Sequence, residues 1–321
     1  MPFRATNPRS QGRFAMAGNL LDKALRLTAR IMAKSTAIVG YRGVGRLFRP
    51  LSQIGRLRCV EAVQPLGSNR HITFPAFDYY WGPFLWTGRP YEEDVEAIFR
   101  RLAPLQHKLL IDCGANIGYW TVKLSDPRYG FDRIIAIEPN SFVYGYLKRN
   151  AAAVGGNVTA MKKAIGGRDG ETVLIDETAG HAVGMVGDVG VPVETVSIGS
   201  LLAARRSSSR GTVIVKLDVE GGEIDAIRGA EGEHGFDLLF IFEDWPRSGM
   251  TVTGYVIGVG YLVFGMNREG RVQALTSVAE AIAFNAANSV GYQPSNLIAT
   301  RQPDRFLPIL NGTGTGRSVH A

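Results

Sequence analysis

The sequence predicts an α/β fold in which a mostly parallel sheet carries helices on both faces. Short apolar runs recur along residues 108–300, and several end in an acidic residue, as the run 109–111 does at Asp112. A segment with helical spacing follows most of these runs, and alternating strands and helices form parallel sheets with right-handed crossovers. The chain has 321 residues, of which 45% are hydrophobic, enough for one large domain or a domain with an extension.

The first ninety residues differ from this pattern. Residues 1–18 are polar and rich in Arg, Pro, Ser and Gln, a composition typical of disordered segments. Leucine, alanine and isoleucine recur on one face of residues 20–34, which predicts an amphipathic helix with Asn19 as its N-cap. Residues 60–87 are rich in aromatic side chains and predict short strands or loops with a packing role.

From residue 91 onward, helices and strands alternate regularly. Helices are expected at 91–103, 117–125, 141–153, 198–205, 221–230, 251–258 and 277–287. Strands are expected at 108–112, 133–137, 157–161, 212–218, 237–243, 261–266, 271–275 and 296–300. Residues 171–197 have β-like patterning, the turn at 267–270 predicts a late hairpin, and residues 302–321 are expected to form a loose tail.

A turn of small residues follows the strand at 108–112. Gly114, Asn116 and Gly118 stand at every second position after Asp112, before a helix begins. Glycine lets the backbone approach a ligand closely, and the free N–H groups of a helix start can face it, so the turn is typical of sites for nucleotide-like ligands. The alternative is a glycine-rich turn with a purely structural role.

A second acidic residue, Glu138, ends the apolar run 134–137 and lies 26 positions after Asp112. At the end of the second strand it is placed to accept hydrogen bonds from two ribose hydroxyls. The turn reads D-x-G-x-N-x-G and lacks the triple glycine of dinucleotide sites. A ribose and a sulfonium amino acid without a pyrophosphate describe S-adenosylmethionine, with Asp112 toward its ammonium end. The alternative is that Asp112 is a cap and Glu138 a surface charge.

Five motifs carry a family resemblance. In chain order they are Pro-Tyr-Glu at 90–92, Ile-Asp-Cys-Gly-Ala-Asn-Ile-Gly-Tyr at 111–119, Ala-Ile-Glu-Pro-Asn at 136–140, Lys-Leu-Asp-Val-Glu-Gly-Gly-Glu at 216–223 and Gly-Tyr-Leu-Val-Phe at 260–264. Over roughly residues 88–300 the chain closely resembles the FkbM-type methyltransferases. The departures are small: Cys113 stands where a small aliphatic residue is more usual, and Gly222 where alanine is common.

The resemblance implies a class I methyltransferase (Rossmann-like) fold, with a mostly parallel seven-stranded sheet in the order 3-2-1-4-5-7-6 and an antiparallel edge hairpin. It implies O-methylation that depends on S-adenosylmethionine, and it leaves the acceptor open. The expected cofactor residues are Glu92, Asp112, Gly114, Asn116, Gly118, Glu138 and Ala164, the last near the adenine. The expected divisions are a basic extension at 1–60, a substrate-side or lid segment at 61–107, the catalytic domain at 108–301 and a tail at 302–321.

Methyl transfer to a hydroxyl needs a group that takes the hydroxyl proton. Asp218, Glu220 and Glu243 stand at or just past predicted strand ends, where ligands bind in such sheets, and are the candidate bases. The structural alternatives are that Asp218 only holds cofactor, Glu220 caps the next helix and Glu243 pairs with a surface base. His181 is expected to be a solvated loop residue, and Lys216 the partner of a carboxylate. Three carboxylates could bind Mg²⁺, but no metal is expected.

Charge is distributed unevenly along the chain. Residues 1–60 carry ten Arg and two Lys against Asp22 alone, a net charge of +11, and the remaining 24 basic and 28 acidic residues give −4. The overall charge of +7 therefore does not indicate a body that binds nucleic acid. A basic amphipathic helix can lie on an anionic membrane surface, so peripheral membrane contact through residues 1–60 is one interpretation. The alternative is a helix that packs on the sheet or pairs subunits.

The sequence also bounds the setting and the rival functions. The two cysteines, Cys59 and Cys113, imply no disulfide framework, and no apolar run reaches the about 18 residues of a membrane span, so a cytoplasmic location is expected. The expected acceptor is a hydroxyl of a sugar, glycan or secondary metabolite. One rival is a nicotinamide-dependent oxidoreductase, against which Asn116 counts, and the other is a non-catalytic cofactor-binding module. The sequence does not indicate an oligomeric state.

Overall fold

The computed structural model divides the chain into two compact units. It describes residues 20–38, 60–67, 69–78, 80–177, 186–187, 189–204, 211–232, 235–289 and 294–313. The first unit holds the described residues up to Ala62 together with Pro75–Arg89, and the second holds Val63–Phe74 and the described residues from Pro90 onward. The hairpin of β1 (Glu61–Pro65) and β2 (His71–Pro75) belongs to both, because the boundaries fall within it.

Two helices form most of the described part of the first unit. α1 (Leu20–Ile38) confirms the amphipathic helix expected at 20–34 and packs on α3 (Trp81–Leu85). The short helix α3 was not expected from the sequence. Asp78 fixes its start, because the Oδ1 atom of Asp78 accepts hydrogen bonds from the backbone N–H groups of Tyr80 and Trp81 at 2.8 and 2.7 Å. Among the described residues, no helix has both the length and the apolarity that crossing a membrane requires.

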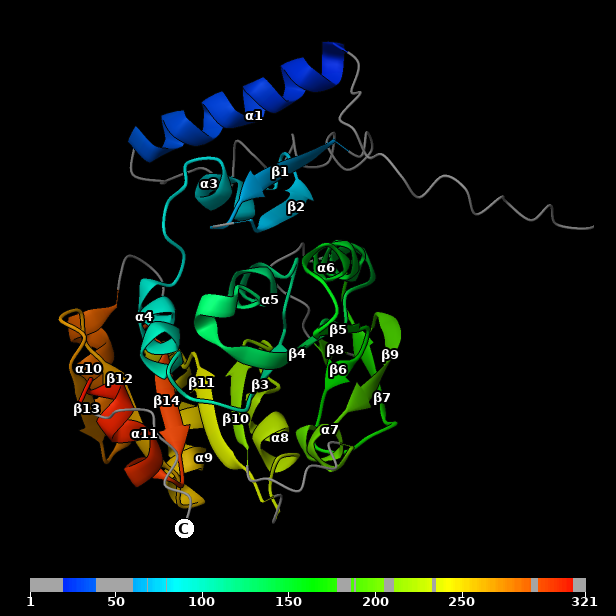
Figure 1. Ribbon diagram of the computed structural model, residues 1–321. Coiled ribbons are helices and arrows are strands. Elements are labelled where there is room, and N and C mark those ends of the chain that lie inside the picture. The colour runs from blue at the N-terminus through cyan, green and yellow to red at the C-terminus, as the bar shows by residue number, and fades with distance from the viewer. Residues whose placement is uncertain are drawn as a thin grey trace, which may run out of the picture. The chain divides into compact units, whose positions relative to one another are not determined.

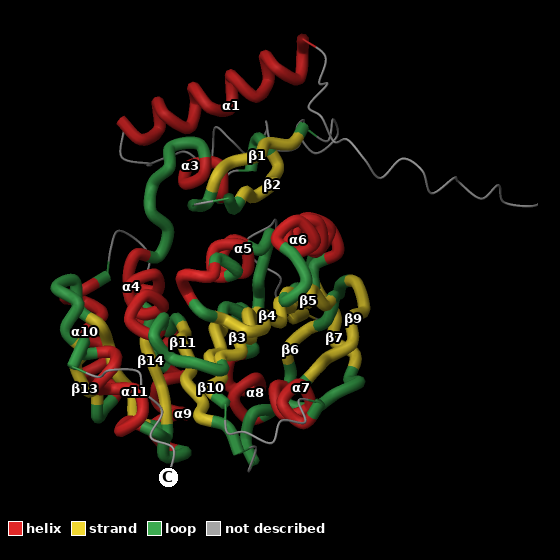
Figure 2. The backbone as a smooth tube through the Cα atoms, in the orientation of Figure 1, coloured by secondary structure: helices red, strands yellow, loops and turns green. Residues whose placement is uncertain are grey.

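The second unit is built on an eight-stranded sheet, whose strands run side by side in Figures 1 and 2. From edge to edge the strands are β13 (Val272–Leu275), β12 (Leu262–Met266), β14 (Leu297–Thr300), β11 (Asp237–Phe242), β10 (Thr212–Leu217), β3 (Lys108–Cys113), β4 (Phe131–Ile137) and β5 (Val158–Met161). The five strands from β11 to β5 are parallel, β14 is antiparallel to both of its neighbours, and β13 is antiparallel to β12. The predicted class I methyltransferase order is confirmed. The eighth strand, β13, is the second strand of the expected edge hairpin.

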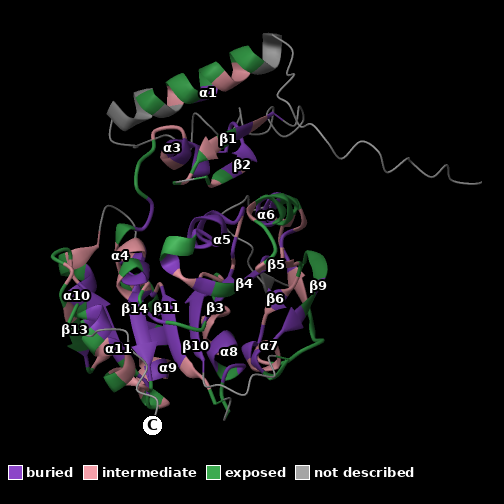
Figure 3. Cartoon of the chain, viewed as in Figure 1, coloured by how far each residue is buried: buried purple, intermediate pink, exposed green. Residues whose placement is uncertain are grey.

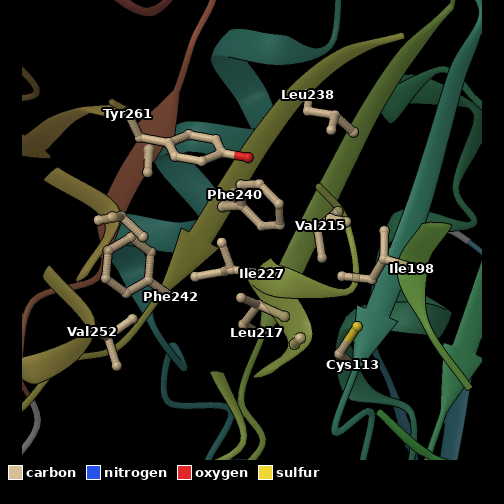
Figure 4. Close-up of a cluster of buried hydrophobic side chains, with 14 of the residues drawn as sticks. Cys113, Ile198, Val215, Leu217, Ile227, Leu238, Phe240, Phe242, Val252 and Tyr261 are labelled. Carbon is tan, nitrogen blue, oxygen red and sulfur yellow. The ribbon is translucent and has the colours of Figure 1, made fainter. Parts of the chain in front are cut away.

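Helices cover both faces of this sheet (Figure 1). Alternate residues of β3, Leu109, Ile111 and Cys113, belong to one buried cluster, part of which Figure 4 shows. The helices that contribute to this cluster are α7 (Ile198–Ala203), α8 (Glu223–Arg228), α9 (Thr251–Gly258) and α10 (Val278–Asn288). On the opposite face, Ala136 of β4 packs against Leu147 of α6 (Ser141–Val154), and α5 (Tyr119–Leu124) lies beside α6. The central strands are buried along their length (Figure 3).

α4 (Glu93–Leu102) lies in this second unit and is tied to the first strand of the sheet. Lys108 of β3 is fully buried, and its Nζ donates hydrogen bonds to the carbonyl oxygens of Leu102 and Ala103 at 2.9 and 2.7 Å. The lysine therefore caps the carboxyl end of α4, and burial lowers the pKa of Lys108 to about 8. Residues 90–107 thus share a compact unit with the sheet. The predicted divisions at 60, 107 and 301 stay predictions.

The end of the described chain differs from the expectation. α11 (Pro303–Leu310) replaces part of the loose tail expected at 302–321 and packs on α4. Phe306 and Leu310 are fully buried, and the guanidinium of Arg101 donates a hydrogen bond to the carbonyl of Leu310 at 2.5 Å. The tail prediction is therefore wrong for residues 303–310, because their apolar face completes the core. Residues 314–321 lie outside the described residues.

Smaller elements complete the second unit. The β-like patterning of residues 171–197 is confirmed by a four-stranded sheet. Its strands, in order, are β6 (Ala164–Ile165), β9 (Val191–Val196), β7 (Thr172–Ile175) and β8 (Val186–Gly187). Two short 3-10 helices, η1 (Pro127–Tyr129) and η2 (Pro246–Ser248), lie in loops that follow α5 and β11.

Candidate active site

The carboxyl ends of the parallel strands bring most of the predicted site residues to one edge of the sheet. In the register of the sheet, Lys216 of β10 pairs with Asp112 of β3, and Asp112 pairs with Ala136 of β4. Glu138 and Asp218 follow Ala136 and Lys216 by two residues, and Glu243 likewise follows Ile241, the partner of Lys216 on β11. The edge therefore carries a row of acidic side chains on four neighbouring strands.

The glycine-rich turn after β3 is shaped by the protein itself. Gly114 and Asn116 have φ angles of 74° and 52°, in the left-handed region. The N–H of Gly114 donates to the carbonyl of Ile137 at 3.0 Å, and a Cβ at Gly114 would lie 1.8 Å from the carbonyl oxygen of Asp218. Glycine is therefore required at 114 so that the β3 and β10 loops can touch. Gly118, with φ 90°, begins α5 close to Leu147.

Glu138 is held by backbone groups of two loops. Its Oε2 accepts a hydrogen bond from the N–H of Asn116, and its Oε1 from the N–H of Asn140, both at 2.9 Å. The Asn140 side chain in turn caps α6. Glu138 is 6% exposed, which excludes the alternative of a surface charge. Burial raises the pKa of Glu138 to about 7, and the two backbone hydrogen bonds oppose the shift.

Asp112 lies at the centre of the row. It is 2% exposed, and its Oδ2 accepts a hydrogen bond from the hydroxyl of Thr121 in α5 at 2.6 Å. Burial raises the pKa of Asp112, and the nearby Lys216 ammonium opposes the shift. Thr121 could not be singled out from the sequence, because its role depends on α5 folding back over the end of β3.

A buried lysine links Asp218 to the start of α4. The Nζ of Lys216 lies 3.1 Å from Asp218 Oδ2 and 3.6 Å from Glu92 Oε2. The indole N–H of Trp120 donates to the same Glu92 oxygen at 2.6 Å. Burial raises the pKa of Glu92 to about 7, against the attraction of Lys216. The expectation that Lys216 pairs with a carboxylate is confirmed, and it pairs with two.

Glu243 lies half-buried at the end of β11. Burial raises the pKa of Glu243 well above its ordinary value, and the carboxyl groups of Glu92 and Asp218 raise it further. The next residue, Asp244, accepts hydrogen bonds from the N–H and hydroxyl of Thr253 at 2.7 and 2.8 Å and so fixes the start of α9. Asp244 was not predicted, although an acidic residue after a strand is the same signal that marked Glu243.

Two predicted residues, Glu220 and Ala164, do not belong to this row. Glu220 is exposed and has a φ angle of 40°, and it does not cap α8, where the carboxylate of Glu223 instead accepts from the N–H of Gly221 at 3.0 Å. Ala164 is buried in β6, where it pairs with Thr195 of β9. His181 lies outside the described residues. Within the described ranges, no group of three or more His, Cys, Asp or Glu side chains could hold a metal ion.

Residues 112–241 match the family model of the methyltransferase FkbM domain. The resemblance drawn from the motifs is therefore confirmed for this part of the chain. The matched range includes Asp112, Glu138 and Asp218, and it ends before Glu243 and begins after Glu92. No curated protein matches the chain.

Solved structures show a more distant likeness. The chain is similar to the methyltransferase FkbM from Methylobacillus flagellatus KT at 16% identity and a TM-score of 0.37, over 69% of this chain and 53% of that one. It is similar to an S-adenosylmethionine-dependent O-methyltransferase from Thermotoga maritima at 10% identity and a TM-score of 0.37, over 66% of each chain. It is similar to an rRNA methylase from Streptococcus thermophilus at 13% identity and a TM-score of 0.37, over 66% of this chain and 96% of that one. The chain spans about half the length of the first of these, and nothing about function follows from a likeness at this level.

S-adenosylmethionine is the cofactor that a methyltransferase FkbM domain implies. The residues at the strand ends fit its parts. Each oxygen of Glu138 holds one backbone N–H and keeps a second lone pair, which a ribose hydroxyl can use. The buried carboxyl groups beside Lys216 suit a cofactor that carries positive charge on its sulfonium and ammonium groups.

Proposed function

We propose that the protein is an S-adenosylmethionine-dependent methyltransferase that acts on a hydroxyl group of a sugar, a glycan or a secondary metabolite. The observation that supports it best is the row of carboxyl groups across the ends of β3, β4, β10 and β11, beside the turn that holds Glu138. One end of the row suits a ribose, and the other offers groups that can take a proton.

The cofactor residues of this proposal are those expected from the sequence. In this proposal Glu138 accepts hydrogen bonds from the ribose hydroxyls, and the turn at 114–118 runs alongside the cofactor. Asp112 and Glu92 face the amino acid part of the cofactor, and Ala164 lies near the adenine. When bound, S-adenosylmethionine supplies an electrophilic methyl group on a good leaving group. The protein must then align the acceptor oxygen with that methyl group and exclude water.

Asp218 is the preferred base. Its side chain is 36% exposed, so an acceptor can reach it, and the ammonium of Lys216 fixes one of its oxygens. The acceptor hydroxyl would give its proton to Asp218 as the oxygen attacks, a contribution of roughly 10²–10⁴-fold to the rate. Glu243 is the second candidate because it is half-buried in the same row. Glu220 is the third, because it is exposed at the mouth of the same loop.

A labelled methyl-transfer assay tests this proposal. The full-length protein is incubated with methyl-labelled S-adenosylmethionine and a panel of sugars, glycans and hydroxylated metabolites, with RNA and amines as comparison acceptors. Label that enters hydroxylated acceptors supports the proposal, and label that enters only RNA or amines contradicts it. In single turnovers Asp218→Asn should be far slower than wild type, and Glu93→Gln, an exposed control on α4, should not.

A thermal unfolding measurement beside this assay separates the rival functions. A nicotinamide-dependent oxidoreductase would be stabilised against heat by NAD(H) and not by S-adenosylhomocysteine. A non-catalytic binding module would bind S-adenosylmethionine and transfer no label to any acceptor.

We also propose that residues 1–60 bring the protein to an anionic membrane surface. On α1, Leu27 and Ile31 are 59% and 55% exposed and lie one turn apart. Lys23, Arg30 and Lys34 are exposed on the same side of the helix, while Ala29 is buried. An apolar pair flanked by cations suits the headgroup region, where each Lys or Arg contributes about 1 kcal/mol.

Vesicle sedimentation tests the membrane proposal with the full chain. Wild type should sediment with phosphatidylglycerol vesicles and much less with phosphatidylcholine vesicles. Leu27→Asp should reduce the bound fraction. Equal sedimentation of wild type and variant, or no binding to either vesicle, would leave α1 as a structural element.

A further inference from the structure

The buried ammonium of Lys216 interacts with four carboxyl groups at the strand ends. Lys216 contacts Asp218 and Glu92 directly, and its side chain is 3% exposed. Asp112 and Glu243 also act on it, so that although burial lowers the pKa of Lys216, the four carboxyl groups together raise it well above its ordinary value. A single ammonium cannot balance four carboxylates. The cluster therefore has negative charge to spare, or it holds protons in place of a second cation.

The two oxygens of Glu92 differ in their surroundings. Oε2 accepts from Trp120 and faces Lys216, whereas Oε1 is buried and has no hydrogen-bond partner. A buried carboxylate oxygen without a partner is unfavourable, which favours the neutral form of Glu92. Oε1 is the oxygen open to that proton, because donors already face Oε2. The raised pKa values of Glu92 and Glu243 agree with this geometry.

Among the described residues, Lys216 is the cation that acts most strongly on Glu92 and Glu243, and the next charged neighbour that they share on α4 is an acid. Asp94 acts on both Glu92 and Glu243 and is itself acidic, and its Oδ2 accepts from the N–H of Asn296 at 2.8 Å. The cluster is closed at Lys216 and Glu92, and it opens at Asp218 and Glu243, which are partly exposed. A positively charged ligand can therefore approach from the strand ends. There it can balance the negative charge of the carboxyl groups, as bound protons do when the ligand is absent.

We propose that this cluster couples cofactor exchange to protonation: S-adenosylmethionine, with its positive sulfonium, releases protons from Glu92 and Glu243 on binding, and S-adenosylhomocysteine releases fewer. The inference rests on the proposed placement of the cofactor at these strand ends. The two ligands share the adenosine and amino acid parts, and they differ in the methyl group and the sulfonium charge. The difference in proton release between the two ligands therefore depends on the charge cluster and not on the ribose contact at Glu138.

The coupling makes discrimination between cofactor and product depend on pH. A carboxylate that has lost its proton attracts the sulfonium, so raising the pH strengthens binding of S-adenosylmethionine more than binding of the product. For each proton by which the two ligands differ, the affinity ratio changes by up to about tenfold per pH unit. Product inhibition should accordingly weaken as the pH rises through 7.

Isothermal titration calorimetry of the full-length protein tests the proposal. S-adenosylmethionine and S-adenosylhomocysteine are each titrated at pH 7 in phosphate and in Tris, whose ionisation enthalpies differ, so that the protons released by each ligand can be counted. More protons should be released with S-adenosylmethionine, and its affinity advantage should rise between pH 6 and pH 8. Equal proton counts for the two ligands would overturn the proposal. Failure of both ligands to bind would instead overturn the assigned function.

Variants in which glutamine replaces glutamate identify the carboxyl groups that release the protons. Glu92→Gln and Glu243→Gln should each reduce the difference in proton release between the two ligands, and Glu93→Gln, an exposed neighbour on α4, should keep it. Thermal unfolding without ligand checks that each variant is folded, and if Glu92→Gln does not fold, Glu243→Gln decides. A full difference that survives in the folded amide variants would show that the protons come from elsewhere.

Discussion

Glu138 and Glu92 are buried carboxyl groups in the same candidate site, and burial raises the pKa of each to about 7, yet their surroundings differ. Glu138 is held by two backbone N–H groups from neighbouring loops. Glu92 is held by the side chains of Trp120 and Lys216, and one of its oxygens has no hydrogen-bond partner. We call the first region, Glu138 with the turn at 114–118, the backbone platform, and the fold holds it in place. The second region, Glu92 with Trp120 and Lys216, is a charge cluster whose protonation a ligand can alter.

The largest expected effect concerns the backbone platform. Gly114→Ala would place a Cβ 1.8 Å from the carbonyl oxygen of Asp218, at a residue with a φ of 74°. The clash and the left-handed conformation together should lower the free energy of unfolding by about 4 kcal/mol or more. Chemical denaturation measures it. The control is Gly155→Ala, which has a φ of 107° and open space around its Cβ position, so that it adds backbone strain without a clash and should cost about 1–3 kcal/mol. Similar losses for the two variants would contradict the close loop contact.

The next effect concerns the charge cluster. Lys216→Met removes the ammonium and leaves Asp218 and Glu92 without their shared cation, which should lower the free energy of unfolding by about 3–4 kcal/mol at pH 7. Urea denaturation measures the change. Lys163→Met, which breaks the exposed pair with Glu194, should change stability little. If the two lysine variants lose the same stability, Lys216 does not hold the cluster together.

A third prediction concerns how stability depends on pH. Glu138 binds its proton more tightly in the folded protein, where its pKa is about 7 against an ordinary 4.5. Stability from this group is therefore fully present below pH 4.5 and is lost as the pH rises to 7, by roughly 3 kcal/mol. Denaturation of wild type and Glu138→Gln at several pH values measures it. Between pH 4.5 and 7, the free energy of unfolding of the variant should fall less than that of wild type. Parallel curves of unfolding free energy against pH would mean that burial does not raise the pKa of Glu138.

The smallest effect concerns the residue between the two regions. Thr121→Val removes the hydroxyl that donates to Asp112 Oδ2 at 2.6 Å, so a buried carboxylate loses a hydrogen bond. The expected cost is about 1.5 kcal/mol of unfolding free energy, measured by thermal or urea denaturation. Thr313→Val, which removes an exposed hydroxyl that donates to the carbonyl of Pro308 at 3.0 Å, is the matched control and should have almost no effect. An unchanged stability in Thr121→Val would remove Thr121 from the site.

The platform could be predicted from the sequence because its signals are local. An apolar run that ends in Asp112 or Glu138 marks a strand end, and the spaced small residues mark the turn. The alternation of strands and helices predicted a mostly parallel sheet, and the turn at 267–270 predicted the edge hairpin. The order of the strands came from the family resemblance. What the sequence could not give is the reason for Gly114, which is a contact with Asp218 about a hundred positions later.

The charge cluster was only partly predictable because its contacts join distant segments. Glu92, Trp120 and Lys216 meet only after α4 and α5 pack over β10. The helix α11 was missed for a similar reason, since Phe306 is apolar in a short segment and its burial depends on α4. Pairing of Lys216 with a carboxylate was expected from the two-residue spacing to Asp218, whereas its second partner, Glu92, lies 124 positions away.

The central claim is that the ends of β3 and β4 hold the ribose of S-adenosylmethionine through Glu138. Calorimetric titration of the full-length Glu138→Ala variant with S-adenosylmethionine tests it most directly. The ribose hydroxyls would lose their acceptor, so the account predicts that binding weakens by about 1–3 kcal/mol, roughly 5- to 150-fold in the dissociation constant, with the variant still folded. An affinity equal to that of wild type would contradict this placement of the cofactor.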